Sequence, residues 1–214
     1  MKSVLLVGTF LLGAVGCGPE GLLLGEQPTL SGRIEGLGPE DSQVVVLPLL
    51  GDATLATGSV GADGAFRVQL PARDAIAPSL RELALMPYPA CTSLPKVEPA
   101  GLPIAVVHLA TRDASGKGGS TLVATNRPSP RGDRRPGDTE VSLLYADQDG
   151  TLEGVYDCSH GLAHETSRYT VALHKGWNFY STTITELTVD ASGSRVAVEN
   201  SAGPLPPDVK WYLQ

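Results

Sequence analysis

The residues of this sequence that could do chemistry gather around one short segment. The segment DCSHGLAH, 157–164, contains His160 and His164, and His174 follows it. Two histidines four residues apart would share one face of a helix and could bind zinc, and a third would complete a catalytic site. However, Gly161 and the strand-like pattern around it predict a loop. We therefore favour solvated loop histidines, and keep a metal-dependent hydrolase built on His160, His164 and His174 as an alternative.

A second pattern is similar in composition to a calcium-binding loop. The segment ADQDGTLEG, 146–154, offers the carboxylates of Asp147, Asp149 and Glu153. An EF-hand needs glycine at its sixth position and glutamate at its twelfth, whereas glycine is fourth here and glutamate seventh. The segment therefore predicts a hairpin turn at Asp149 and Gly150 rather than an ion site.

The sequence offers little for nucleophilic catalysis. It contains no Gly-x-Ser-x-Gly elbow, in which a serine would be exposed on a sharp turn between a strand and a helix. We expect a protein that is not an enzyme, with no catalytic residue, no metal site and no cofactor.

Four aromatic residues near the C-terminus suggest a further alternative. Trp177, Tyr180, Trp211 and Tyr212 could form a flat platform for sugar rings, which would make this a carbohydrate-binding surface protein. Tryptophans in a protein with only three phenylalanines more often form the core. We therefore favour core positions for these aromatic residues.

Composition limits the class of protein. The 214 residues carry a formal net charge of −7, and 25 glycines and 17 prolines divide the chain into short segments rich in valine and threonine. This profile predicts an all-β protein. An acidic chain with scattered arginines has no phosphate-binding face, so nucleic acid is not expected as a partner.

The N-terminus has the pattern of an export signal, expected as an N-terminal signal helix. Lys2 precedes an apolar run over 4–15, which is too short for a stable membrane anchor of about 20 residues. The following Ala14-Val15-Gly16-Cys17 resembles the lipobox of bacterial lipoproteins. The resemblance implies cleavage before Cys17, which would then carry diacylglycerol and an acylated amino group.

Lipid on Cys17 would hold the protein at a membrane, because two or three acyl chains anchor a protein that one chain binds only reversibly. The alternative is an ordinary secreted protein with a cysteine near its cleavage site. Gly18 stands where many inner-membrane lipoproteins have aspartate, so the resemblance favours the outer membrane over the inner membrane.

Two cysteines remain if Cys17 is lipidated. In an oxidising compartment this even number predicts a disulfide between Cys91 and Cys158. Two buried free thiols or a metal site are the alternatives. A bond between these residues would connect the two halves of the chain.

The alternation of apolar and polar residues predicts two β-rich units joined by loose linkers, a β-sandwich followed by an antiparallel meander or second sandwich. Strands are expected on both sides of a loop that contains no apolar residue. The predicted divisions are a signal peptide over 1–16, a tether over 17–28, the sandwich over 29–99, and a C-terminal antiparallel domain over 100–214 with a solvated loop over 126–138.

Parts of both units resemble known families. Residues 31–34, 43–47 and 62–71, with their Asp-Gly turn and the Phe that follows, are similar to carboxypeptidase regulatory-like or transthyretin-like β-sandwich modules. Such modules are mostly noncatalytic. The segments YTVALHKGWNFY, 169–180, and PPDVKWYL, 206–213, are similar to the C-terminal ends of bacterial lipoproteins of unassigned function.

We therefore expect a membrane-anchored envelope lipoprotein that acts as a noncatalytic structural or binding module. Its expected partners are the membrane, reached through lipidated Cys17, and an envelope protein or glycan.

Overall fold

The structure is a computed structural model. It describes residues 24, 26–38, 41–83, 90–128, 133–191 and 193–214. The predicted signal peptide and Cys17 lie outside the described residues. In the part of the chain that is described, no helix has the length and apolar character needed to span a bilayer.

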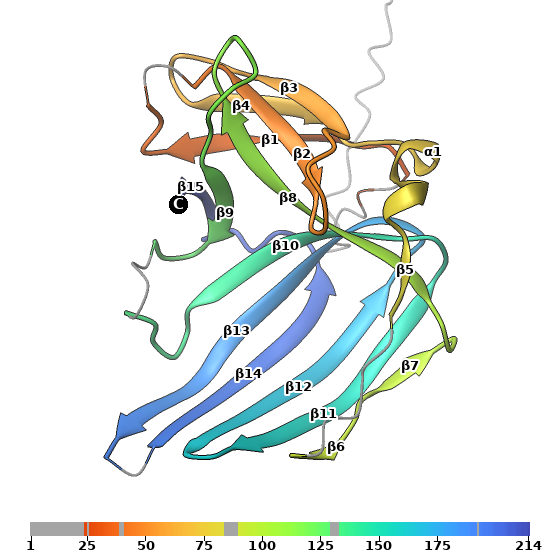
Figure 1. The fold of residues 1–214 in the computed structure, drawn as a ribbon, viewed down its shortest axis with the longest axis vertical. Coiled ribbons are helices and arrows are strands. Elements are labelled where there is room, and N and C mark those ends of the chain that lie inside the picture. The colour runs from red at the N-terminus through yellow and green to blue at the C-terminus, as the bar shows by residue number, and fades with distance from the viewer. Residues whose placement is uncertain (1–23, 25, 39–40, 84–89, 129–132, 192) are drawn as a thin grey trace, which may run out of the picture.

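The protein is all-β, as the composition and alternation predict, with fifteen strands among the described residues (Figure 1). Two short helical turns, α1 (Arg73–Ile76) and η1 (Ala77–Ser79), separate the early strands from the later ones. The strands are β1 (Thr29–Glu35), β2 (Gln43–Pro48), β3 (Ala56–Val60), β4 (Ala65–Gln69), β5 (Arg81–Glu82), β6 (Cys91–Ser93), β7 (Lys96–Glu98), β8 (Pro103–Arg112), β9 (Thr121–Thr125), β10 (Thr139–Ala146), β11 (Gly150–His160), β12 (Ala163–Leu173), β13 (Gly176–Asp190), β14 (Gly193–Gly203) and β15 (Lys210–Leu213).

Eight strands form a sheet that closes on itself, which we call the closed sheet. Its order is β8, β2, β3, β4, β1, β15, β9 and β10, and β10 pairs again with β8. The first and last of the described strands, β1 and β15, lie side by side and run parallel, with Ile34 opposite Trp211. Closure leaves no unpaired edge along most of this sheet.

The interior of the closed sheet is the larger of two cores. In β4, buried and exposed side chains alternate, since Phe66 and Val68 are buried whereas Arg67 is exposed. The ring of Phe66 meets Trp211 edge to face, with centroids 5.6 Å apart. Trp177 is buried in the same core, and its indole Nε1 donates to the carbonyl oxygen of Pro71 at 3.0 Å.

The remaining long strands form a second layer, which we call the open sheet. It runs β10, β13, β14, β12 and β11, with the short strands β6 and β7 on its outer edge. Because β14 lies between β12 and β13, it is parallel to β12, and this sheet departs from a simple meander. Its core is small, and the residues are Leu102, Leu144, Ala146, Leu152, Val171 and Leu173.

The predicted boundary between residues 99 and 100 does not separate the two sheets. The closed sheet takes β1 to β4 from the predicted sandwich and β8, β9, β10 and β15 from the predicted C-terminal domain. Val46, for example, lies opposite Leu109 across β2 and β8. The segment 29–99 therefore does not make a sandwich of its own, because four of its strands need partners from the rest of the chain to complete their sheet.

The end of the predicted tether is packed against the body of the protein. The side chain of Leu24 contacts the larger core, and the carbonyl oxygen of Pro28 accepts a hydrogen bond from Leu70 at 2.9 Å. Glu26 forms an ion pair with Lys175, with 2.9 Å between Oε1 and Nζ. Residues 24 and 26–28 thus belong to the folded part of the chain.

Candidate ligand-binding site

The structure does not bring the three predicted histidines together. His164 lies in a strand of the β11–β12 hairpin rather than in the predicted loop, and its Nε2 is 2.8 Å from Oδ1 of Asp157. His174 follows the opposite end of β12, about 30 Å away at the usual rise per residue of a strand. The side chain of His160 lies outside the described part of the chain. His164 and His174 therefore cannot share one metal ion.

The rest of the described chain offers no metal site either. Among the described residues, no group of three histidine, cysteine, aspartate or glutamate side chains is placed to hold a metal ion. Two carboxylates of the segment 146–154, which is similar in composition to a calcium-binding loop, contact other groups. Asp147 accepts two hydrogen bonds from Arg73, at 2.6 and 2.7 Å, and Asp149 accepts one from the backbone N–H of Lys175 at 2.7 Å.

The predicted hairpin turn at Asp149 and Gly150 is wrong. The segment joins β10 to β11, and these strands do not pair with each other, since β10 pairs with β13 and β11 with β12. A turn signal in the sequence marks where the chain reverses, but it does not identify the strands that pair.

The predicted disulfide is confirmed. Cys91 in β6 and Cys158 in β11 form a bond of 2.08 Å between their sulfur atoms. The bond connects a strand of the predicted first unit with a strand of the second, and it secures β6 to the edge of the open sheet.

The predicted aromatic platform does not form, because the tryptophans are in the core. Trp177 is 2% exposed and Trp211 is 5% exposed, as the favoured interpretation of the sequence expects. Tyr180 lies apart from both on the open sheet, where its hydroxyl donates to Oδ1 of Asn200 at 2.8 Å and burial raises its pKa. Tyr212 is half-buried on β15.

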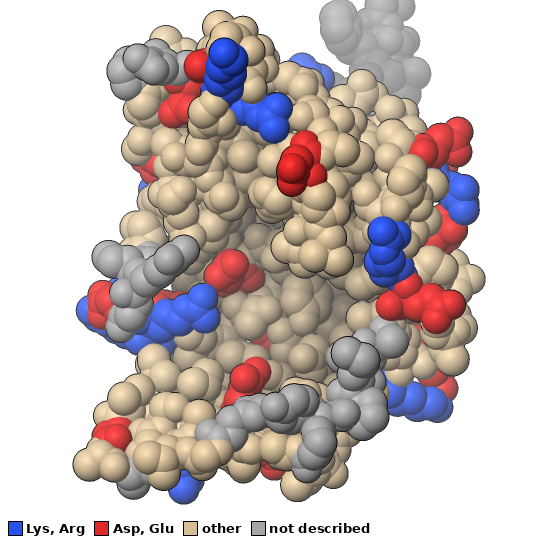
Figure 2. Space-filling model, in the orientation of Figure 1, with Lys and Arg blue, Asp and Glu red and all other residues tan. Residues whose placement is uncertain are grey.

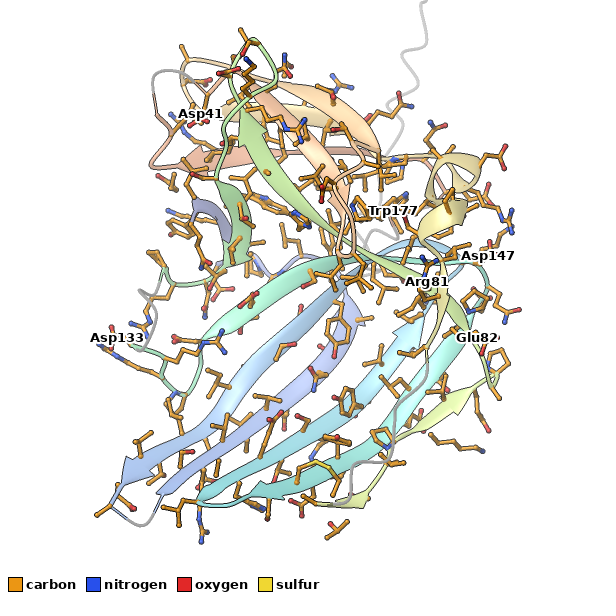
Figure 3. The ribbon with its side chains drawn as sticks, viewed as in Figure 1. Asp41, Arg81, Glu82, Asp133, Asp147 and Trp177 are labelled. Carbon is orange, nitrogen blue, oxygen red and sulfur yellow. A yellow bond between two sulfur atoms is a disulfide. The ribbon has the colours of Figure 1, made fainter. Side chains whose placement is uncertain are left out.

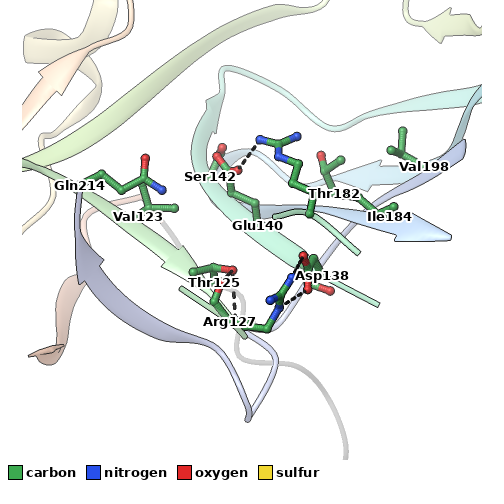
Figure 4. Close-up of a pocket in the computed structure, with 12 residues that line it drawn as sticks. Val123, Thr125, Arg127, Asp138, Glu140, Ser142, Thr182, Ile184, Val198 and Gln214 are labelled. Carbon is green, nitrogen blue, oxygen red and sulfur yellow. Dashed lines mark hydrogen bonds and ion pairs between the residues drawn. The ribbon is translucent and has the colours of Figure 1, made fainter. Parts of the chain in front are cut away.

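A concave site does lie in the angle between the two sheets, near the end of β10 where the chain enters this strand. We call it the junction pocket, and it has a volume of about 280 Å³ (Figure 4). In the space-filling view the molecule is hollowed between the closed and open sheets (Figure 2). The pocket is lined by Val123, Thr125, Arg127, Arg134, Asp138, Thr139, Glu140, Ser142, Thr182, Ile184, Val198 and Gln214.

These side chains face the pocket because successive side chains of a strand point to opposite faces of the sheet. On β10, Val141 and Leu143 point into the core of the closed sheet, so Ser142 points the other way, toward the pocket. Register carries this face across to β13, where Thr182 lies opposite Glu140. The next strand adds Val198, which lies opposite Ile184. Three adjacent strands thus supply one wall of the pocket.

The described residues Arg127, Arg134 and Asp138 of the predicted solvated loop, 126–138, supply the opposite rim of the pocket. Arg127 donates to both carboxylate oxygens of Asp138, at 2.8 and 2.7 Å, and also to Asp133. The hydrogen bonds from Arg127 lower the pKa of Asp138, and those from Arg135 and Arg127 lower the pKa of Asp133. The ion pairs keep the rim in one arrangement.

The side chain of Asn126 makes a second set of hydrogen bonds where this segment meets β9 and β10. Asn126 donates from Nδ2 to the carbonyl oxygen of Gly137 at 2.8 Å, and its Oδ1 accepts from the N–H of Thr139 at 2.9 Å. The segment contains no apolar residue, so its described residues are held by polar contacts.

Sequence reasoning missed the junction pocket because its residues are ordinary when read one at a time. Serine, threonine and valine on a strand indicate only which face is polar. The one available signal was the pairing of arginines and aspartates in the segment 126–138, which indicated solvation rather than a wall. No known protein family, curated protein or solved structure matches this chain.

Proposed function

We propose that this protein is a lipid-anchored protein of the bacterial envelope that acts as a noncatalytic binding module. The observation that carries the proposal is the pairing of Cys91 with Cys158. The sequence has three cysteines, so this bond leaves Cys17 as the one that can take lipid. A disulfide also indicates an oxidising compartment outside the cytosol.

The packed end of the tether supports a body held close to the bilayer. Leu24, which contacts the core, comes only seven positions after Cys17. A fully extended chain of that length spans at most about 25 Å. The proposal therefore places Lys175 and its neighbours on the side of the body that faces the membrane, with the outer membrane favoured by Gly18.

The junction pocket supports binding rather than catalysis. The charged side chains that line it, in the part of the chain that is described, are two arginines and two carboxylates, and they are paired with one another. The visible face of the protein carries acidic and basic side chains in small groups of mixed sign, with no continuous basic patch (Figure 2). Such a surface favours neither nucleic acid nor a strongly charged partner.

The anchor is tested by replacing Cys17 with serine in a bacterium with two membranes. The wild-type protein should sediment with membranes, and mass spectrometry should find acyl chains on its N-terminal cysteine. Cys17→Ser should release the protein into the soluble fraction.

The matched control removes the other two cysteines. The double variant Cys91→Ser, Cys158→Ser should lose stability yet stay in the membrane fraction. Retention of Cys17→Ser in membranes, or an unmodified N-terminus in the wild-type protein, would contradict the proposal.

A further inference from the structure

We infer that the junction pocket binds an uncharged saccharide unit. The inference rests on the proposed binding function and names the class of ligand. A sugar ring needs two things from a site, an apolar surface for its C–H groups and hydrogen-bonding groups for its hydroxyls. The junction pocket offers both within one concavity.

The apolar surface comes from aliphatic side chains on three strands. Ile184 and Val198 lie side by side across β13 and β14, and Val123 lines the pocket from β9. None of the lining residues is aromatic, so the sugar would rest on branched aliphatic groups rather than stack on a ring. We therefore expect weak, millimolar affinity for a single unit.

The hydrogen-bonding groups include both donors and acceptors. Ser142 and Thr182 carry hydroxyls, Gln214 carries an amide, and Glu140 and Arg134 carry charged groups at the rim. The side chains of Arg134 and Glu140 are 67% and 52% exposed. Because both side chains are exposed, both can turn toward a ligand, and breaking their 3.7 Å ion pair leaves no buried charge unpaired.

Charge balance favours a neutral ligand over an anion. Among the described residues, the four charged side chains that line the pocket, Arg127, Arg134, Asp138 and Glu140, sum to zero. Arg127 is committed to Asp138 by two hydrogen bonds, so an anionic group would have to compete with that carboxylate. A hydroxyl can donate to a carboxylate or accept from a guanidinium while the pair stays intact.

Size and position also fit a glycan. Ligand pockets for drug-sized molecules hold about 300–1,000 Å³, so a volume of about 280 Å³ suits one or two sugar rings. Asp133, next to the pocket, and Asp147, near the docked tether, lie on opposite sides of the molecule (Figure 3). Thr182 is seven residues along the chain from Lys175, a span of about 23 Å in a strand. The pocket would thus be held off the bilayer.

The experiment is a titration of the full-length protein in detergent, followed by NMR of its backbone amides. The probes are glucose, galactose and N-acetylglucosamine, each at millimolar concentration, with glucuronate and glucose 6-phosphate as charged counterparts. We expect saturable shifts at Ser142, Thr182 and Ile184 with at least one neutral sugar. Ser142→Ala should weaken that binding about two- to tenfold.

A matched pair of substitutions separates occupation of the pocket from general damage. Ser142→Phe fills the pocket and should abolish the shifts, whereas Ser201→Phe adds the same ring to an exposed position on the other face of β14 and should leave them unchanged. Folding of both variants is checked by the dispersion of their spectra.

Three results would overturn the inference. One is the absence of shifts with every neutral sugar, another is equal binding by Ser142→Phe and the wild-type protein, and the third is binding of the charged probes only, with loss in Arg134→Gln. The anchor test reads membrane retention of Cys17→Ser and does not depend on sugar binding. Failure of one proposal therefore leaves the other standing.

Discussion

Both carboxylate oxygens of Asp138 accept a hydrogen bond from Arg127, Oδ1 from Nε at 2.8 Å and Oδ2 from Nη2 at 2.7 Å. The ion pair is bidentate, so it fixes the orientation of both side chains as well as their separation. It joins the end of β9 to the start of β10 and shapes one wall of the junction pocket.

This pair predicts a loss of stability in acid. Because the folded protein lowers the pKa of Asp138 and Asp133, their contribution is present above the unfolded carboxyl pKa, near 3.9, and is lost as pH falls through the lower folded values. Asp138→Asn should lower the melting temperature at pH 7, and the gap to the wild-type protein should narrow below about pH 4. Thermal unfolding from pH 7 to pH 2 measures this, and a gap that does not change with pH would contradict it.

Removal of the disulfide should destabilise the protein, because the bond secures β6 to the edge of the open sheet. Cys91 and Cys158 are 67 residues apart, and the chain-entropy model gives roughly 4 kcal/mol for a loop of this length. Cys91→Ala combined with Cys158→Ala should lower the free energy of unfolding by up to this amount, measured by urea titration. Reduced wild-type protein should match the double variant, and an unchanged midpoint would show that the bond adds nothing.

Tyr145 should tolerate the loss of its hydroxyl. The residue is fully buried against Trp177, and among the described residues its hydroxyl has no hydrogen-bond partner. Tyr145→Phe should therefore keep or raise the melting temperature, since it removes a polar group that is buried without a partner.

The matched control is a second tyrosine whose hydroxyl is bonded. Tyr180→Phe removes the hydrogen bond to Asn200 and should cost about 0.5–1.5 kcal/mol. Thermal unfolding should show a lower melting temperature for Tyr180→Phe and an equal or higher one for Tyr145→Phe. Equal destabilisation by both would mean that the hydroxyl of Tyr145 is satisfied.

Gly32 should not accept a side chain. A Cβ at this position would lie 2.7 Å from Cε1 of Phe66 and 2.9 Å from Cδ1 of Trp211. The backbone of β1 lies so close to these two rings that only glycine fits at residue 32. Gly32→Ala should cost about 1–3 kcal/mol, as overpacked cores do. Gly203→Ala, which meets no atom within 4 Å, is the control and should leave the unfolding midpoint nearly unchanged.

Several features were predictable from the sequence because they depend on a local pattern of residues or on whether the number of available cysteines is even. The alternation of Phe66 and Val68 with Arg67 follows from the period of a strand. The burial of the tryptophans follows from the shortage of other large apolar residues, and the Cys91–Cys158 bond follows from an even count of cysteines. Each of these needs no knowledge of which strands are neighbours.

The pairing of strands was not predictable in the same way. A period of two tells which face is buried, but it does not identify the strand that covers an edge. The sequence therefore does not show that β2 would pair with β8, or that β14 would lie between β12 and β13. The junction pocket is formed by strands of both sheets, so it could not be predicted without knowing which strands pair.

The closure of one sheet by its first and last strands has a consequence for how the protein is made. β15 fills the place between β1 and β9, so the ring of strands cannot be completed until residues 210–213 have been synthesised. An unfinished chain would keep the edges of β1 and β9 unpaired and its aromatic core open to water. Such a chain cannot reach its final fold until β15 has been added to the ring of strands.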